Sequence, residues 1–326
     1  MIISKTPLRI SFVGGGTDYK DFYKHQQGMV ISATINKYVY VIVNKRFEGN
    51  IRLNYTKTEI VDHVDQLQHE LIKEAMKLTG ADSGVDITTI ADIPGWGTGL
   101  GSSSSVTVGA LNALYAFRGK HKSAEELAKE ACKIEIDILG GPNGKQDQYI
   151  VAYGGLNALT FKSNEEVSVE EILISDDKKN EFNSNLLLFY TGKTRKAHAI
   201  LSEQKINTKN NMGSLVKMKN LAKEMKKCLT KHQLNKIGEL LHKNWLEKKQ
   251  LATEITNSEI DFLYQKAIKN GALGGKICGA GGGGFLLFYC EPQKQKQVKK
   301  VLSDLRELKF QFEPRGSEII FTHKDD

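Results

Sequence analysis

The chain has 326 residues, of which 40% are hydrophobic and 26% are charged, so it is long enough for two domains with buried cores. Lysine and arginine exceed the acidic residues, 46 against 38. The basic segment at residues 205–249 has the pattern of an amphipathic helix with a solvated face and lacks interleaved aromatic residues. This pattern does not favour a nucleic-acid-binding protein. No apolar run approaches the ~18 residues of a membrane span and the N-terminus lacks a signal-peptide pattern, so we expect a cytoplasmic protein without a membrane partner.

The first part of the chain predicts strands followed by helices. Alternating aromatic and β-branched residues are typical of strands, and leucine and alanine at helical spacing predict helices. The strands are expected at residues 8–13, 37–46, 51–55 and 85–93, and the helices at a segment that ends at Gly80 and at residues 103–117 and 123–139.

The second part mixes strands and helices without strict alternation. After a strand at residues 154–161, an acidic and polar segment up to residue 185 is the best candidate for a linker. Further strands are expected at residues 186–190, 283–290 and 318–322, and helices at residues 194–204, 212–270 and 293–305. This irregular order favours an α+β fold over a doubly wound sheet.

A segment rich in glycine and serine, PGWGTGLGSSSS at residues 94–105, lies between a predicted strand and a predicted helix. Glycines allow a backbone to approach an anion closely, and the first turn of a helix offers unpaired N–H groups to phosphate. The alternative is a tight turn followed by an ordinary serine cap. Because one cap needs one serine and one turn does not need four glycines, the pattern favours a phosphate-binding loop.

Two more glycine clusters accompany this loop. FVGGGTD at residues 12–18 ends a predicted strand, and KICGAGGGGFLLFY at residues 276–289 begins one. A Walker A motif is absent, and the GxGxxG at residues 279–284 precedes a strand, where a dinucleotide-binding fold would not have it. Three glycine turns of this kind suggest the walls of one cleft around a ligand.

The segments PLRISFVGGGTD, PGWGTGLGSSSS and KICGAGGGGF, in this order, resemble the three signature motifs of the GHMP kinases. The resemblance implies transfer of a phosphoryl group from ATP, with Mg²⁺, to the hydroxyl of a small molecule. It also implies a two-domain fold, with a domain like domain 2 of ribosomal protein S5 at residues 1–180 and a ferredoxin-like domain at residues 181–326. The ATP-binding residues would then be Gly97, Gly99, Leu100, Gly101, Ser102, Ser103, Ser104 and Ser105.

The resemblance also implies catalytic residues. Asp147, in GGPNGKQDQYI, matches the family's catalytic aspartate, for which the alternative is an ordinary aspartate in a turn, and Arg9 occupies the basic position of the first motif. Glu135 matches the Mg²⁺-associated glutamate, and its apolar neighbours at helical spacing independently predict a buried carboxylate that needs a cation. Ser103 would be the hydroxyl ligand of the metal, with Ser104 as a rival.

The same comparison implies the acceptor. Galactokinases carry Glu-His where this chain has Gly15-Gly16, so galactose is disfavoured, whereas the GGGTD form and YTGKTRKAH at residues 190–198 most resemble the bacterial members that phosphorylate D-glycero-D-manno-heptose 7-phosphate. A cationic cluster after a predicted strand would bind the phosphate already on the sugar; its alternative is a solvated surface. The expected substrate-binding residues are Gly15, Gly16, Thr17, Asp18, Gly281, Gly282, Lys193 and Arg195.

The sequence thus predicts an ATP-dependent kinase of the anomeric hydroxyl of a heptose 7-phosphate, whose product is the 1,7-bisphosphate. Two alternatives stay open, which are a kinase of another sugar, of the fucose or hexose type, and a non-catalytic ligand sensor on the same fold. Its partners would be the sugar phosphate and ATP, with a homodimer left open.

Overall fold

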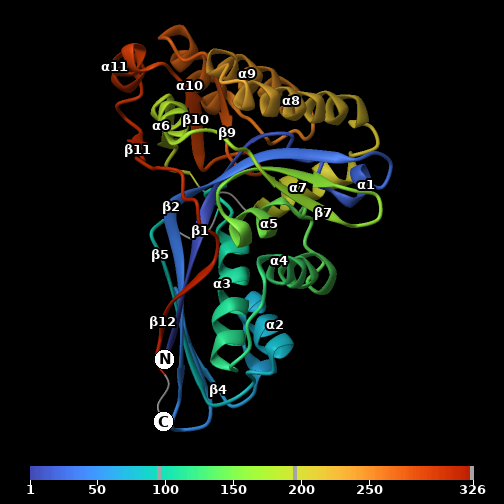
Figure 1. Ribbon diagram of the computed structural model, residues 1–326, viewed down its shortest axis with the longest axis vertical. Coiled ribbons are helices and arrows are strands. Elements are labelled where there is room, and N and C mark those ends of the chain that lie inside the picture. The colour runs from blue at the N-terminus through green and yellow to red at the C-terminus, as the bar shows by residue number, and fades with distance from the viewer. Residues whose placement is uncertain (94–96, 194–196, 324–326) are drawn as a thin grey trace.

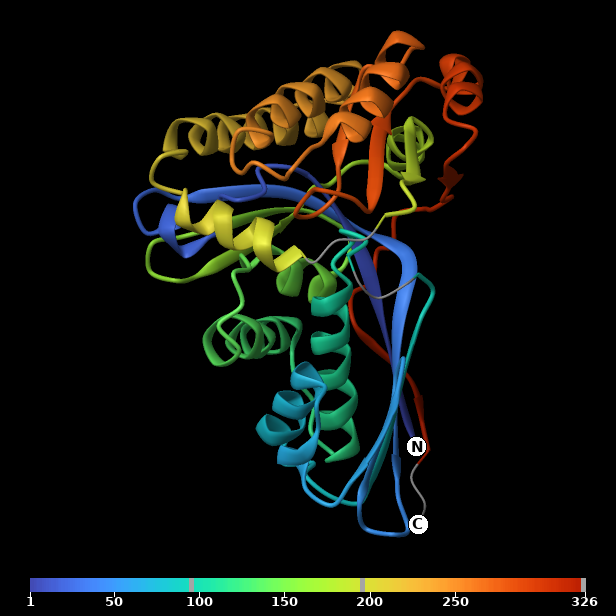
Figure 2. The same cartoon turned by 180° about the vertical axis from the view of Figure 1, so that it is seen from behind.

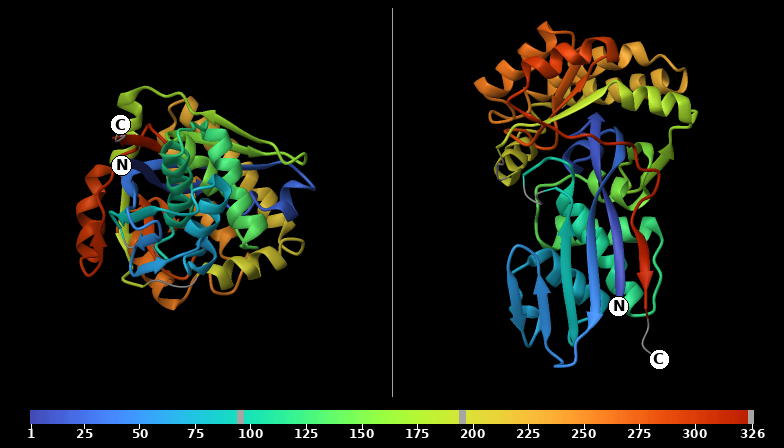
Figure 3. Two further views of the ribbon diagram at one scale, coloured as in Figure 1. Left: turned by 90° about the horizontal axis from the view of Figure 1, so that it is seen from below. Right: turned by 90° about the vertical axis from the view of Figure 1, so that its left-hand side faces the viewer.

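The computed structural model describes residues 1–93, 97–193 and 197–323, and it is an elongated α+β molecule with two parts along its long axis (Figure 1). One part is a large sheet with helices on one face. The other is a smaller sheet covered by long helices at the opposite end of the molecule (Figure 2). The first residues of the chain lie beside residues 318–323, where the Met1 ammonium group donates to the His323 carbonyl oxygen and β1 (Ile2–Val13) pairs with β12, the strand at residues 318–322. The right-hand view of Figure 3 shows these two strands side by side.

The large sheet is organised around one long strand, β2 (Gly28–Lys45). One edge of β2 pairs with β1 (Ile2–Val13), and its other edge pairs with β6 up to Ala33 and with β5 from Val39 onward. Arg9 of β1 lies opposite Thr34, at the point where β2 changes partners. The strand order is β12-β1-β2-β5-β3-β4, with β6 beside β2 and β7 beside β6. The other strands are β3 (Ile51–Asn54), β4 (Thr58–Val61), β5 (Val85–Ala91), β6 (Leu156–Phe161), β7 (Val167–Glu171) and β12 (Glu318–Thr322).

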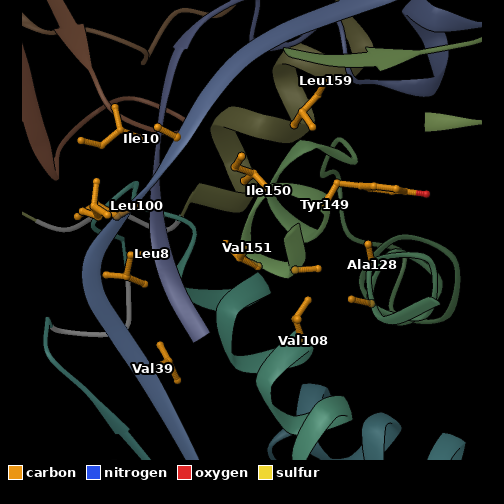
Figure 4. Packing of buried hydrophobic residues seen from close by; sticks show 14 of the residues in the cluster. Leu8, Ile10, Val39, Leu100, Val108, Ala128, Tyr149, Ile150, Val151 and Leu159 are labelled. Atoms are coloured by element: carbon orange, nitrogen blue, oxygen red, sulfur yellow. The ribbon is translucent and has the colours of Figure 1, made fainter. Parts of the chain in front are cut away.

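Helices cover one face of this sheet, and the face seen in the right-hand view of Figure 3 carries none over its long strands. The core forms where α3, rich in alanine, leucine and valine, packs on β1 and β2. Figure 4 shows part of this core, with Leu8, Leu100, Val108 and Val151 among its members. The helical segments are α1 (Lys20–Tyr23), a 3₁₀ turn (Val64–Gln66), α2 (Glu70–Thr79), α3 (Ser102–Phe117), α4 (Ala124–Cys132), a π-helix (Lys133–Ile138) and α5 (Gln146–Tyr153).

The smaller sheet is antiparallel, with the order β11-β8-β10-β9. Its strands are β8 (Leu186–Tyr190), β9 (Gly274–Ile277), β10 (Phe285–Tyr289) and β11 (Arg306–Glu307). The accompanying helices are α6 (Asp176–Ser184), α7 (Ala197–Ile206), α8 (Met212–Thr230), a 3₁₀ turn (Leu234–Lys236), α9 (Ile237–Lys248), α10 (Ser258–Lys269) and α11 (Pro292–Val301). None of the described helices is both long and apolar enough to cross a bilayer.

The predicted α+β class is confirmed, with one correction to the chain's organisation. The acidic segment after residue 161 is not a linker, because it forms the edge strand β7, paired with β6, and helix α6, capped by the Ser175 side chain. Its exposed acidic side chains belong to the outer faces of these elements. The division at residue 180 stays a prediction, and the last strand, β12, returns to pair with β1 of the large sheet.

Candidate active site

The three glycine-rich segments meet at one cleft of about 630 Å³. The cleft takes residues from both parts of the molecule, including β1, the loop before α3, the loop before α5, and α7, α9 and β9. Gly15, Gly16 and Asp18 line it from the first segment, and Gly279 and Ala280 line it from the third. The expectation that these turns are walls of one cleft is therefore confirmed.

The second and third glycine segments cross with their backbones in contact. A Cβ on Gly99, which has φ of +77°, would lie 2.3 Å from the carbonyl oxygen of Cys278. A Cβ on Gly279 would lie 2.5 Å from the Cα of Gly99. Any side chain at these two positions would separate the loops, so the glycines set how closely the two parts of the molecule approach at the cleft.

Helix α3 begins beside the cleft without a side-chain cap. Its N-cap residue is Gly101, in the left-handed region at φ of 80°, and no side chain caps the first turn. The residues of that turn, Ser102, Ser103 and Ser104, line the cleft. An uncapped helix N-terminus presents free N–H groups and the positive end of the helix dipole, which suits an anion such as phosphate.

The four consecutive serines make four different sets of contacts. Ser102 shares a 3.3 Å hydrogen bond with the Thr98 hydroxyl, and Ser103 is exposed in the cleft. The Ser104 hydroxyl donates to Glu135 Oε2 at 3.1 Å. Ser105 donates to the carbonyl oxygen of Pro7 at 2.8 Å and lies outside the cleft lining. Ser104, the rival in the sequence analysis, is thus the serine that meets Glu135.

Glu135 is a buried carboxylate with one unsatisfied oxygen. It lies in the π-helix that continues α4, and it is 3% exposed, as its apolar neighbours predict. Oε2 accepts from Ser104 and from Asn143, whereas no described residue donates to Oε1 with the geometry of a hydrogen bond. Burial raises the pKa of Glu135 to about 7, although the Thr107 and Gln148 side chains lie close enough to oppose the rise. A buried carboxylate oxygen without a donor fits a cation, which would make up its remaining ligands from serine, phosphate oxygens and water.

Arg9 and Asp147 form a two-pronged ion pair at the cleft. Arg9 Nε donates to Asp147 Oδ1 at 2.7 Å, and Nη2 donates to Oδ2 at 2.6 Å. Nη1 donates to the Gly99 carbonyl oxygen at 2.6 Å, which ties the pair to the glycine loop. Burial alone would lower the pKa of Arg9, but the Asp147 carboxylate outweighs it and the pKa lies above its usual value. The pair fixes the Asp147 carboxylate at the first residues of α5, within reach of a bound molecule.

Asp18 lies beside this pair. Its Oδ1 accepts from the Gly16 N–H at 2.8 Å, and its Oδ2 accepts from the Gln146 side chain at 3.0 Å. Burial raises the pKa of Asp18, and the nearby Asp147 charge adds to the increase. These contacts orient a carboxylate toward the cleft, where it can accept a hydrogen bond from a hydroxyl group.

Several residues predicted to bind ligand do not line the cleft. Thr17 and Leu100 are fully buried, and the Thr17 hydroxyl bonds the carbonyl oxygens of Gly14 and Met29. Gly281 and Gly282 pack on the backbone of Ile255 instead. Lys193 is exposed and forms an ion pair with Glu259. Arg195 lies outside the described residues.

The cleft also contains residues that the sequence analysis did not assign. Lys248 at the end of α9 and Lys276 of β9 are both buried and both line it, as do Gln146 and His198. Lys276 is the first residue of the third glycine segment, so a motif in the sequence marks its position. Lys248 is one of many lysines in a basic helical stretch, and nothing in its immediate sequence distinguishes it.

The fold and the cleft together define a class of protein. An uncapped helix N-terminus for phosphate, a buried carboxylate that fits a cation and a fixed carboxylate for an acceptor hydroxyl are the parts of a phosphotransferase.

Comparison with known proteins agrees with this class. Residues 66–155 match the family "GHMP kinases N terminal domain", and residues 225–308 match "GHMP kinases C terminal". The D-glycero-alpha-D-manno-heptose 7-phosphate kinase of Campylobacter jejuni is 31% identical over 92% of this chain and 93% of its own length. The L-fucokinase/L-fucose-1-P guanylyltransferase of Bacteroides fragilis is 27% identical over 93% of this chain but 36% of its own length.

A solved structure supports the same assignment. The crystal structure of a D-glycero-D-manno-heptose 1-phosphate kinase from Bacteroides thetaiotaomicron has a TM-score of 0.82 and 27% identity, and the match covers 99% of this chain and all of that one. The chain belongs to the GHMP kinase family, whose members use ATP, and it is an enzyme that transfers a phosphoryl group to an alcohol. The two-domain GHMP kinase fold expected from the motifs is thereby confirmed.

Proposed function

We propose that this enzyme phosphorylates the anomeric hydroxyl of D-glycero-D-manno-heptose 7-phosphate with ATP and forms the 1,7-bisphosphate. The relative from Campylobacter jejuni, named for the 7-phosphate substrate, supports the choice of sugar. The observation that carries the chemistry is the Arg9–Asp147 pair in a cleft that also contains the uncapped start of α3. A cytoplasmic location belongs to the same proposal and rests on the sequence alone, and a homodimer stays open.

Each group in the cleft has a role in the proposed transfer. The N–H groups of Ser102–Ser104 and the loop at Gly97–Gly101 bind the triphosphate. Asp147 accepts a hydrogen bond from the acceptor hydroxyl and takes its proton as the oxygen bonds to the γ-phosphorus and the bond to the ADP oxygen breaks. Arg9 is a positioning residue, because its two hydrogen bonds hold the Asp147 carboxylate at the cleft. Asp18, held by Gly16 and Gln146, binds another sugar hydroxyl.

The proposed Mg²⁺ ligands are Glu135 and Ser104, in place of the Ser103 expected from the sequence. No described residue donates to Glu135 Oε1 with the geometry of a hydrogen bond, and Ser104 already lies against Oε2. When bound, Mg²⁺ would neutralise phosphate charge during the transfer. Ser103, exposed in the cleft, remains a phosphate contact.

A second candidate is a kinase of an unphosphorylated sugar of the fucose type. The similarity to the bifunctional L-fucokinase, which covers 93% of this chain, supports this alternative. A non-catalytic sensor is disfavoured, because Arg9 and Asp147 line one cleft together with Ser104, whose hydroxyl bonds the buried Glu135.

The decisive experiment incubates the enzyme with ATP, Mg²⁺ and either D-glycero-D-manno-heptose 7-phosphate or a panel of free sugars, and follows ADP release. ³¹P NMR of the product should show a new anomeric phosphate. Asp147→Asn keeps the size of the side chain but removes the base and one of the two acceptors for Arg9, so kcat should fall roughly 100-fold or more. Turnover of free sugars alone would reject the heptose phosphate, and an Asp147→Asn enzyme that is folded and fully active would reject the base.

A further inference from the structure

Two buried lysines face the cleft without an acidic partner. We propose that Lys248 and Lys276 form an anion subsite that receives the phosphate group already present on the sugar, which assigns this role away from Lys193 and Arg195. The inference rests on the proposed function, since it presumes a phosphorylated acceptor. It explains how one cleft can hold two phosphate-bearing substrates at separate places.

Lys276 lies in the middle of β9 and is 2% exposed. Its Nζ donates to the carbonyl oxygen of Ser11 at 2.7 Å. An ammonium group has three N–H donors, so two donors remain for a molecule in the cleft that the side chain lines. The bond to Ser11 therefore aims the ammonium group and does not exhaust it.

Lys248 ends α9, is 5% exposed and lines the same cleft. The structure gives its Nζ no hydrogen bond or ion pair with any described residue. The end of α9 is fixed by Asn244, one turn earlier, whose Oδ1 accepts from the Gly14 N–H at 3.1 Å. Burial of an unpaired ammonium group is costly, so a lysine held there by the fold indicates an anionic ligand.

The acidic groups nearby are already engaged. Both oxygens of Asp147 accept from Arg9, and both oxygens of Asp18 accept from Gly16 and Gln146. Burial lowers the pKa of Lys248 to about 8 and that of Lys276 to about 7, and the charge of Lys248 further lowers the second. The charges of Asp18 and Asp147 offset part of this lowering for Lys248, and a phosphate group between the two ammonium groups would offset more of it.

The position of the lysines favours the sugar over ATP. Lys276 contacts Ser11, and the helix of Lys248 contacts Gly14, so both are tied to the first glycine segment, which also contains Asp18. The uncapped start of α3, where the triphosphate is proposed to bind, belongs to the second segment. Lys193, by contrast, is paired with Glu259 outside the cleft lining.

The test compares Lys248→Met with the wild-type enzyme and with Lys243→Met, a change of an exposed lysine in the same helix that pairs with Glu239. Binding of heptose 7-phosphate, free heptose and inorganic phosphate is measured by calorimetry, and KM for ATP by turnover. We expect Lys248→Met to weaken the binding of heptose 7-phosphate by about 30- to 100-fold, because a buried charge-assisted contact is lost. The affinity for free heptose should be unchanged. Lys248→Arg should restore part of the affinity, and Lys243→Met should match the wild type.

The outcomes separate the two proposals. Equal loss for heptose 7-phosphate and free heptose would overturn the subsite, and so would a raised KM for ATP with unchanged sugar binding. Unchanged affinity for both heptose 7-phosphate and inorganic phosphate would also overturn it. A wild-type enzyme that does not phosphorylate heptose 7-phosphate, yet binds inorganic phosphate in a way that needs Lys248, would keep the subsite and reject the proposed function. The melting temperature of each variant checks that it is folded. The Lys276→Met variant tests the second lysine of the subsite in the same binding measurements.

Discussion

At the scale of single residues, the four serines at the start of α3 show how neighbouring identical side chains acquire different roles. Successive residues of a helix point about 100° apart, so only one of them can face Glu135. Ser104 does so, while Ser105 turns back to Pro7 and Ser103 faces the cleft. The sequence leaves Ser103 and Ser104 as candidates for a metal ligand, and the rotation of the helix favours Ser104, the serine that meets Glu135.

Ser104→Ala should therefore raise the Mg²⁺ concentration needed for half-maximal activity by roughly 10-fold or more, because a buried metal-facing oxygen is lost. Ser103→Ala should change this concentration less and act mainly on KM for ATP. A titration of activity with Mg²⁺ at saturating ATP measures both. The reverse order of effects would return the metal to Ser103.

The buried carboxylate of Glu135 should lower the stability of the fold when it is ionised, although the ionised form is the one proposed to bind Mg²⁺. Its pKa of about 7 in the folded protein lies above its ordinary value of 4.5. Between about pH 4.5 and pH 7, Glu135 is therefore protonated in the folded protein but ionised in the unfolded chain. The free energy of unfolding falls as the pH rises through this range, and the loss is complete above about pH 7. This difference in pKa corresponds to a loss of at most about 3 kcal/mol in the free energy of unfolding.

Glu135→Gln cannot ionise and should escape this loss. In EDTA, its melting temperature should exceed that of the wild type at pH 8 by several degrees and converge with it near pH 5, while its kinase activity is largely lost. Thermal unfolding at a series of pH values checks the first part. A constant difference between pH 5 and pH 8 would show that the carboxylate does not titrate in this range.

At the scale of elements, the contact between the two glycine loops holds α3 and β9 in place. A methyl group on Gly99 would meet the Cys278 carbonyl oxygen, whereas one on Gly119, which also has a positive φ of 70°, would meet nothing within 4 Å. The pair of positions separates the cost of the backbone conformation from the cost of the contact.

Gly119→Ala should cost about 1 kcal/mol of unfolding free energy, from the left-handed conformation alone. Gly99→Ala should cost roughly 1–3 kcal/mol more and should raise KM for ATP, because the loop before α3 must move. Urea unfolding and steady-state kinetics measure the two effects. Equal stability of the two variants would mean that the loops separate without cost.

The elements also show what the sequence could and could not predict. Strands β8 and β12 form at the predicted residues, and α3 starts one residue early, because each has a strong apolar pattern between clear stops. The sequence of β7 and α6 predicts a linker, since their exposed faces are acidic and their buried faces contribute few apolar residues. The π-helix at Glu135 has no sequence signature, although the apolar neighbours of Glu135 at helical spacing predict that its carboxylate is buried.

The site follows the same division. Arg9, Asp147 and the glycine loops lie in local motifs, so the sequence alone marks them as candidates, and the structure places them at one cleft. Lys248 was not, because its burial depends on the end of α9 docking against Gly14, a contact between residues 230 positions apart. Such a contact is a property of the tertiary fold, and a helical pattern alone describes Lys248 as one more lysine of a basic helix.

At the scale of the whole molecule, the C-terminal segment connects the two parts, because it runs from β11 in the smaller sheet to β12 in the large sheet. β12 leaves the smaller sheet's side of the molecule and pairs with the first residues of β1, and Ser317 bonds Thr6 at 2.8 Å and Asn112 at 3.0 Å. The stability of the large sheet thus depends on residues at the far end of the sequence. A division of the chain at one point, such as residue 180, would leave β1 with an open edge.

A chain that ends at Gly316 tests this dependence. It loses β12 and the Ser317 contacts, so its melting temperature should fall by about 5–10 °C relative to a chain that ends at His323, which keeps the strand. Arg9 lies beyond the β1 residues that pair with β12, and β1 stays paired with β2 along its other edge, so kcat well below the melting temperature should be nearly unchanged. If the melting temperature were unchanged, β12 would add no stability and the boundary at residue 180 would describe the molecule. If kcat fell in proportion to stability, the end of β1 and the Arg9–Asp147 pair would be coupled through the strand, and the last strand would belong to the catalytic apparatus as well as to the fold.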